Sequence, residues 1–286
     1  MDSNDSVKSK YEILNKLASV FDYLVEVTLG KLFLFVKQIG DIVLFATSSL
    51  RLLFAAPSRV GEMVKHIEFV GNQSLSIITL TALFTGLALS FQLYLGFKLF
   101  NAVNFVGPTV ALGISRELGP VLTGLIVAAR AGGAMAARLG TMRVNEQIDA
   151  LDVMGVNTKQ YLIAPRIFAS IVSMPLLTAV FDFVSMMGCY FLCVYLVELD
   201  AAIFWQRIAD IVQVKHIMEG LLKSAIFGMI FSVICTYRGF TTTGGAKGVG
   251  EATNRGVVLS MVMIIVFDYF ITNMIRIYYL VTGSAV

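Results

Sequence analysis

Five long stretches of mostly apolar residues decide what this chain can fold into. They run over about 69–97, 108–137, 161–190, 217–237 and 257–279. A helix needs about 20 residues to cross the hydrocarbon layer of a membrane, and each stretch reaches that length. Only 14% of the residues are charged, whereas a soluble domain carries about 25%. The sequence therefore predicts an all-α integral membrane protein with five transmembrane helices and no separate soluble catalytic domain.

The residues before the first stretch predict helices that lie at the membrane without crossing it. Residues 11–30 place apolar side chains at helical spacing with charged ones between them, which is typical of an amphipathic surface helix. Residues 32–56 are more apolar but are interrupted by Lys37, Asp41 and Arg51. Each of these charges would cost about 2.5–3.5 kcal/mol at the middle of a bilayer. We interpret 32–56 as a re-entrant or interfacial helix, so that residues 1–68 form an N-terminal part and 69–286 the five-helix transmembrane domain.

The distribution of lysine and arginine predicts the orientation of these helices. Basic residues are frequent before the first stretch and in the second and fourth loops, whereas the remaining loops contain only Lys98, Arg207 and Lys215. Because cytoplasmic loops carry the excess of basic residues, we expect a cytoplasmic N-terminus and a periplasmic C-terminus. A sixth crossing at 32–56 would export Arg59 and Lys65 and invert every later loop.

Glycine, proline and tryptophan mark further local features. We expect Pro120 and Pro175 to kink their helices. Small residues recur at every fourth position in the second stretch and predict close packing with another helix: Gly124, Ala128, Gly132, Ala136 and Gly140. Residues 198–215, which include Trp205, predict an interfacial helix on the outer side. The segment 238–255, rich in glycine and threonine, is interpreted as an ordered loop.

A short two-faced helix is predicted at 141–155, in the loop between the second and third stretches. Its apolar side carries Val144, Ile148 and Leu151, and its acidic side carries Glu146, Asp149 and Asp152. Asn145 is expected to cap its start and Gly155 to end it. Such a helix can lie on the membrane surface or dock into a basic groove of a soluble partner. Because surface helices usually carry basic residues, the carboxylates favour docking.

Several motifs, spread over most of the chain and in the same order, resemble those of the MlaE-type permeases. They are GTMRVNEQIDALDVMG at 140–155, Arg-Glu-Leu-Gly-Pro at 116–120, Ala-Arg-Ala-Gly at 129–132, Pro165-Arg166, and GVGEATNRGVV at 248–258. Members of this family are the membrane subunits of ABC transporters that move lipids together with MCE proteins. The resemblance implies that 141–155 is a cytoplasmic coupling helix, with Arg143, Glu146, Asp149 and Asp152 facing an ATPase subunit.

The resemblance also implies the partners and location of the chain. We expect a homodimer in the cell inner membrane, two ABC ATPase subunits on the cytoplasmic side, an MCE-domain protein on the other side, and phospholipid between them. ATP and magnesium would be bound by the ATPase, so that this chain is not itself an enzyme. No cofactor, metal or nucleic acid is expected to bind here.

Known catalytic and nucleotide-binding motifs do not occur in the sequence. Gly239 and Gly244 have the spacing of a phosphate-binding loop, but Gly245 stands where that motif needs lysine. HExxH and GxSxG motifs are also missing. The three cysteines, Cys189, Cys193 and Cys235, are expected to be free buried thiols because no metal-ligand spacing is present.

Five ionisable residues stand inside the apolar stretches: Arg116, Glu117, Asp182, Lys223 and Asp268. Such residues usually mark a cavity, an ion pair or a transport pathway. Arg116, Glu117 and Lys223 are expected to meet at one level in the outer half of the membrane. Glu117 and Lys223 can form a purely structural pair, or the group can recognise a lipid head group with Arg116 or Lys223 contacting the phosphate. For Asp182 and Asp268, packing and function are both left open.

Two other classes of function predict features that this sequence lacks. An ion-coupled secondary transporter would use Glu117, Asp182 and Asp268, but it predicts inverted repeats, and the two halves of the chain show no self-similarity. An intramembrane enzyme would need a clustered nucleophile and base or metal ligands, which the sequence lacks.

Overall fold

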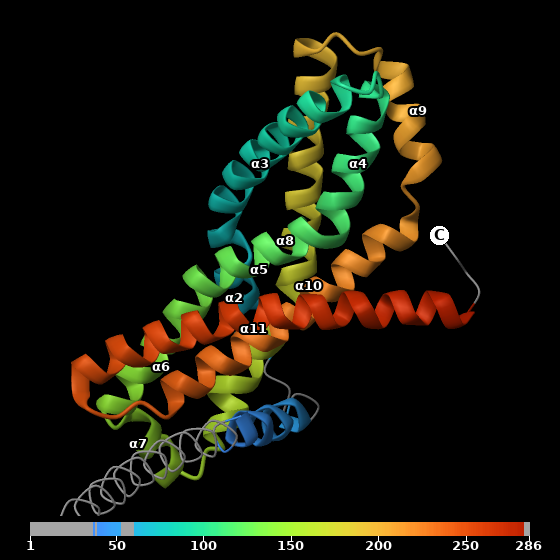
Figure 1. Cartoon of the computed structure of the whole chain (residues 1–286). Helices are drawn as coiled ribbons and strands as arrows, with labels where there is room; N and C mark the ends of the chain where they lie inside the picture. Colours follow the sequence, from blue (N-terminus) through green and yellow to red (C-terminus); the bar gives the residue numbers. More distant parts are fainter. Residues whose placement is uncertain (1–36, 38, 53–59, 283–286) are drawn as a thin grey trace, which may run out of the picture. The chain divides into compact units, whose positions relative to one another are not determined.

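The computed structural model describes residues 37, 39–52 and 60–282, and these residues are helical with short turns and no strand (Figure 1). Five helices are long and apolar enough to cross a membrane: Val60–Lys98, Val103–Val144, Lys159–Leu196, Val214–Phe240 and Gly245–Thr282. The predicted all-α membrane fold with five spans is therefore confirmed. Each of these helices extends its predicted stretch at both ends, least at 97, where the helix ends at Lys98, and most at 257, where it begins at Gly245.

The chain divides into two compact units, residues 1–47 and 48–286. Residues 39–52 are helical, and Lys37, Asp41 and Arg51 are exposed. The predicted surface helix at 11–30 lies outside the described residues. The re-entrant or interfacial placement of 32–56 and the boundary at residue 68 stay predictions, although the helix that leads into the first span already begins at Val60.

The second unit contains all five spans. Its main elements, in chain order, are α2 (Val60–Val70), α3 (Asn72–Lys98), α4 (Val106–Gly113), η2 (Ile114–Leu118), α5 (Gly119–Val127), η3 (Ala128–Gly132), α6 (Gly133–Val144), α7 (Gln147–Val153), η4 (Lys159–Ile163), α8 (Ala164–Tyr190), η5 (Phe191–Leu196), α9 (Ala201–Ile211), α10 (Val214–Phe240) and α11 (Gly245–Thr282). α8 packs against both α3 and α10, and α10 also packs against α6 and α11. α8 and α10 are therefore the inner helices of the bundle.

The second span changes its helical geometry twice. η2 and η3 are π turns, which separate α4 from α5 and α5 from α6. Pro120 is in the first turn of α5, directly after η2. Because proline has no N–H to donate, the π turn falls where the regular bonding pattern cannot continue. The kink expected at Pro120 falls at this π turn, where the second span bends between α4 and α5 (Figure 1). α8 remains one α-helix through Pro175, whose kink stays a prediction.

Neighbouring helices approach each other closely at several glycines, because glycine has no side chain to keep them apart. A Cβ atom on Gly132 would lie 2.8 Å from Cys235 Sγ, and one on Gly239 would lie 2.6 Å from the carbonyl oxygen of Ala136. The small-residue stripe of the second span therefore packs against α10, as predicted. In the same way, Gly86 of α3 lies directly against the backbone of Ser185 in α8.

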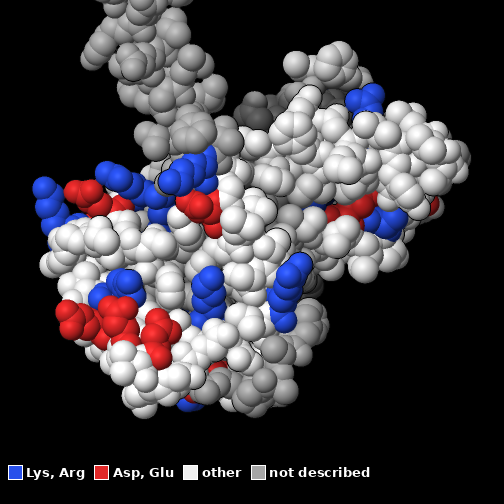
Figure 2. Space-filling model, turned by 90° about the horizontal axis from the view of Figure 1, so that it is seen from below, with Lys and Arg blue, Asp and Glu red and all other residues white. Residues whose placement is uncertain are grey.

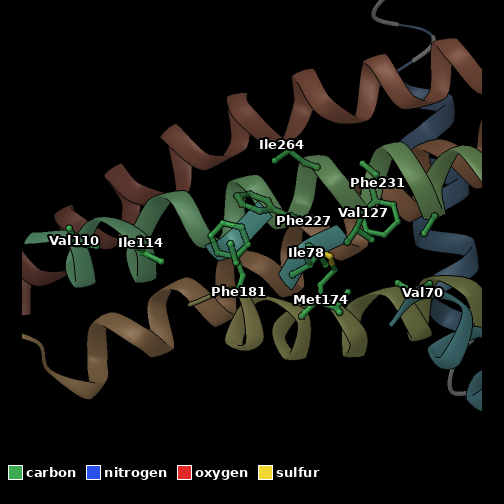
Figure 3. Packing of buried hydrophobic residues seen from close by; sticks show 14 of the residues in the cluster. Val70, Ile78, Val110, Ile114, Val127, Met174, Phe181, Phe227, Phe231 and Ile264 are labelled. Carbon is green, nitrogen blue, oxygen red and sulfur yellow. The ribbon is translucent and has the colours of Figure 1, made fainter. Parts of the chain in front are cut away.

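Large apolar side chains fill the spaces between these contacts. Ile78, Val127, Met174, Phe231 and Ile264 come from α3, α5, α8, α10 and α11, and all are fully buried (Figure 3). A single apolar cluster therefore connects the five spans within the second unit.

The interpretation of 238–255 as a loop was wrong. α10 continues to Phe240 and α11 begins at Gly245. Gly244 and Gly245 have positive φ angles of 89° and 68°, a conformation that glycine adopts without strain. The turn is therefore short, and the following glycines are helical because Val249, Thr253 and Val257 pack beside Gly133 and Gly140 of α6.

The outer segment predicted at 198–215 contains α9. Asp200 caps this helix by accepting hydrogen bonds from the backbone N–H groups of Ala202 at 2.7 Å and Ile203 at 3.0 Å. Phe204 is buried, whereas Trp205 is half exposed and stacks on Tyr190. The predicted helix is confirmed, and its position at the membrane interface stays a prediction.

Candidate functional site

The short helix α7 projects between the second and third spans (Figure 1). Ile148 is fully buried, while Glu146, Asp149 and Asp152 are exposed. The two-faced character predicted from the sequence is therefore confirmed. Val153 and Met154 are 90% and 74% exposed, so that an apolar surface lies beside the carboxylates.

The start of α7 differs from the prediction. Asn145 ends α6, and Glu146 precedes α7 with φ of 57° and no side-chain cap bond. Glu146 is in the left-handed region, and the chain turns at this residue between α6 and α7. α7 itself is seven residues long. The expected cap by Asn145 was wrong. The predicted end is confirmed, because Gly155 has φ of 75°.

The face of the molecule seen from below in Figure 1 carries acidic and basic side chains in separate groups. In the view from below, most acidic and basic side chains lie on the left of the face, and a smaller group of both signs lies on the right (Figure 2). Arg143 of α6 forms an ion pair with Asp149 of α7, with Nη1 2.5 Å from Oδ1. The two side chains are 36% and 53% exposed, so this contact adds little to the stability of the fold.

A second polar group lies inside the bundle, where η2, α10 and α11 meet. Lys223 of α10 is 2% exposed, and its Nζ lies 2.7 Å from Glu117 Oε2 and 3.2 Å from Asp268 Oδ1. The ammonium also donates to Thr272 Oγ1 at 2.7 Å and to the carbonyl oxygen of Arg116 at 2.9 Å. Four acceptors therefore surround this buried cation.

A neighbouring pair extends the group towards the surface. Arg116 Nε lies 3.1 Å from Glu219 Oε2, and Tyr279 donates its hydroxyl to Glu219 Oε1 at 2.6 Å. The Arg116 side chain is 31% exposed. Among the described residues, no acceptor bonds to its two Nη groups, so they are available to an anion. We call Arg116, Glu117, Glu219, Lys223, Asp268, Thr272 and Tyr279 the polar cluster.

Gly220 brings the halves of the polar cluster together. It lies between Glu219 and Lys223 on α10, directly against the carbonyl oxygen of Ser115 in η2, where a Cβ atom would overlap that oxygen. This close approach places Glu219 beside Arg116, and Lys223 beside Glu117. Arg116 and Glu117 are consecutive residues of the π turn η2, and both lie beside α10.

Asp182 lies apart from the polar cluster. Its carboxylate packs against Gly119, the first residue after η2, and both of its oxygens are buried without a hydrogen-bond partner among the described residues. Asp268, the other carboxylate for which the sequence suggested no partner, is paired with Lys223.

Sequence reasoning found three members of the polar cluster as a group but missed others. It predicted that Arg116, Glu117 and Lys223 meet, and the structure brings them together. Glu219 was missed, although it precedes Lys223 by one helical turn. Thr272 was also missed, although it follows Asp268 by one turn. The lipid contact predicted for the group stays a prediction.

The cysteines are free and buried, as expected. Among the described residues, no group of histidine, cysteine and acidic side chains is arranged to hold a metal ion.

Comparison with known proteins identifies the family. The family model for the permease MlaE matches residues 63–274. A probable ABC transporter permease protein of Rickettsia prowazekii is 36% identical over 240 residues, which cover 84% of this chain and 93% of that protein.

Two further relatives are named for their biological roles. The intermembrane phospholipid transport system permease protein MlaE of Haemophilus influenzae is 34% identical, over 73% of this chain and 81% of that protein. The chloroplastic protein TRIGALACTOSYLDIACYLGLYCEROL 1 of Arabidopsis thaliana is 39% identical, over 73% of this chain and 60% of that protein. With five spans and a match over most of its length, this chain is a multi-pass membrane protein that belongs to the MlaE family of ABC transporter permeases.

Proposed function

We propose that the chain is the permease subunit of an ABC transporter that moves phospholipids between membranes, together with a separate ATPase and an MCE protein. Membership of the MlaE family and the role named for the Haemophilus relative support this proposal. The chain carries no nucleotide-binding motif of its own. ATP and magnesium therefore belong to the ATPase, and the N-terminus and α7 belong to the cytoplasmic side of the inner membrane.

The observation that carries the coupling role is the surface of α7. Three exposed carboxylates stand beside exposed Val153 and Met154 on a helix anchored by buried Ile148. An apolar centre with a charged rim is typical of a protein interface. A basic groove on the ATPase would complement these carboxylates. Such charge complementarity increases the specificity and the rate of association between the permease and the ATPase.

Reversing the charge of Glu146 and Asp149 to lysine is expected to abolish association with the ATPase. Both side chains are exposed, so the variant should still fold and insert. Co-purification of the ATPase with the tagged permease measures the effect. Because ATP is cytoplasmic, the same measurement tests the proposed orientation of α7.

Asp210→Lys is the matched control, because Asp210 is also exposed and lies on α9, at the opposite end of the second unit from α7 (Figure 1). It should retain the ATPase. Undiminished co-purification with the α7 variant would remove the coupling role from this helix.

The polar cluster is the proposed contact for the lipid head group. Arg116 presents two unbonded Nη groups at a partly exposed position, which suits a phosphate. Glu117 is 39% exposed and accepts the buried ammonium of Lys223. We therefore assign the phosphate contact to Arg116, and to Lys223 the positioning of Glu117 and of the Arg116 backbone.

A second copy of the chain completes the proposed transporter. α11 exposes apolar residues over much of its length, including Val258, Val262, Ile265 and Tyr269. Such a helix can face lipid or another subunit. The mass of the purified permease in detergent, measured by light scattering, should correspond to two copies, and a single copy would contradict this part.

A further inference from the structure

Two arginines lie close to the ring of Phe69, the next to last residue of α2. The guanidinium carbons of Arg130 in η3 and Arg138 in α6 lie 5.0 Å and 4.4 Å from the ring centroid. Phe69 itself is buried. A third arginine, Arg166, stands near the start of α8 and lies within electrostatic range of Arg138. Three cations from three segments therefore gather around α2.

Of these three arginines, Arg130 makes the most hydrogen bonds to described residues. Arg130 donates to the carbonyl oxygen of Phe69 at 2.7 Å, to Ser74 Oγ at 2.6 Å and to Gln73 Oε1 at 2.9 Å. It thereby bridges the break between α2 and α3. Arg130 therefore has a structural role, which is to connect α2 to α3.

Arg138 and Arg166 are differently placed. Arg166 is 7% exposed, and within the described ranges its one hydrogen bond is to the carbonyl oxygen of Leu162 in η4. Arg138 is exposed and contacts the ring of Phe69 without a hydrogen bond to any described residue. Most of the donors on these two guanidinium groups are therefore free to bind a ligand.

The charge of this group is not balanced by the described part of the chain. No carboxylate oxygen in that part lies within 4.0 Å of Arg130, Arg138 or Arg166. Glu62, the acid within electrostatic range of Arg166, forms its ion pair with Lys65 at 2.8 Å. Arg166 is buried, and a buried cation without a counterion is costly, so the site favours an anion.

The surroundings indicate what kind of anion fits. Guanidinium groups match phosphate oxygens with paired hydrogen bonds. Val64 on α2 and Phe168 on α8 are 57% and 37% exposed, and both apolar side chains are close in sequence to the basic ones. Basic pockets between transmembrane helices on the cytoplasmic side bind anionic lipid head groups. A phosphate with acyl chains attached meets both requirements.

We propose that Arg138 and Arg166 hold the phosphate of an anionic phospholipid between α2, α6 and α8. This lipid is a resident ligand, separate from the transported one. Arg138 follows Arg116 by 22 residues, which corresponds to about 30 Å along the second span at 1.5 Å per residue. Binding needs no ATP and no partner, so the outcome of its test does not depend on the proposed transport function.

The test titrates phosphatidylglycerol, phosphatidylcholine or inorganic phosphate into the full chain in detergent and counts bound molecules by native mass spectrometry. Phosphatidylglycerol should bind to the wild type, and Arg138→Gln should weaken that binding about tenfold or more, because a charge-assisted contact is lost. Arg138 is exposed and bonds no described backbone, so this variant should keep its fold.

Arg255→Gln is the matched control. Arg255 is also exposed, at 69% of its side chain, and its ion pair is with Glu251 of the same helix. This variant should bind phosphatidylglycerol as the wild type does. Equal binding by wild type and Arg138→Gln would overturn the proposal. Arg138-dependent binding of inorganic phosphate without binding of phosphatidylglycerol would overturn the assignment to a lipid.

Discussion

Replacing Lys223 with methionine is expected to destabilise the folded chain by about 3–5 kcal/mol, the usual cost of removing one partner from a buried ion pair. The ammonium is 2% exposed and lies between Glu117 and Asp268. Without it, two carboxylates face each other with no cation between them. The melting temperature of the purified chain in detergent should fall accordingly.

Neutralising both acids should recover most of this loss. In Lys223→Met combined with Glu117→Gln and Asp268→Asn, no uncompensated charge remains in this part of the cluster. A simple exchange of Glu117 and Lys223 is a poorer test, because Asp268, 3.2 Å from the ammonium, would then face a glutamate. A combined variant no more stable than Lys223→Met would show that charge balance is not what Lys223 contributes.

The same variants separate stability from lipid binding. If the polar cluster contacts the head group, the combined variant should regain its melting temperature but still co-purify with less phospholipid than the wild type. Bound lipid that follows the melting temperature through the whole series would mean that the cluster is structural, as the sequence already allowed.

Gly220→Ala is expected to cost about 2–3 kcal/mol, because the new Cβ would overlap the carbonyl oxygen of Ser115 and force α10 away from η2. The displacement would also separate Arg116 from Glu219 and Glu117 from Lys223. Gly113→Ala is the control, since a Cβ there meets nothing within 4 Å. A melting temperature equally unaffected in both variants would contradict the close approach of α10 and η2.

The five spans could be predicted from the length of the apolar stretches, because a helix needs about 20 apolar residues to cross the membrane. The stretch 217–237, for example, became Val214–Phe240. Periodicity also predicted the two faces of α7, since Ile148 is buried and the carboxylates are exposed. Local patterns of this kind depend on the surroundings of each helix alone, so they can be seen in the sequence.

Features that depend on contacts between helices could not be predicted in this way. The helical start of α11 contradicts the low helix propensity of its glycines, and its packing beside Gly140 of α6 explains why. The pairing of Asp268 with Lys223 needs the register of α10 against α11. Pro120 indicated an interruption of the second span, but the form of that interruption, a π turn that places Arg116 and Glu117 beside α10, was not visible in the sequence.

We propose that this chain moves phospholipid only as part of an ATP-driven assembly. The most direct test reconstitutes the permease with its ATPase and the MCE protein in vesicles that contain fluorescent phospholipid, and measures lipid transferred to acceptor vesicles. Transfer should require ATP and should be lost in Glu146→Lys with Asp149→Lys. Transfer that continues without ATP, driven by a proton or sodium gradient, would contradict the account and favour an ion-coupled transporter.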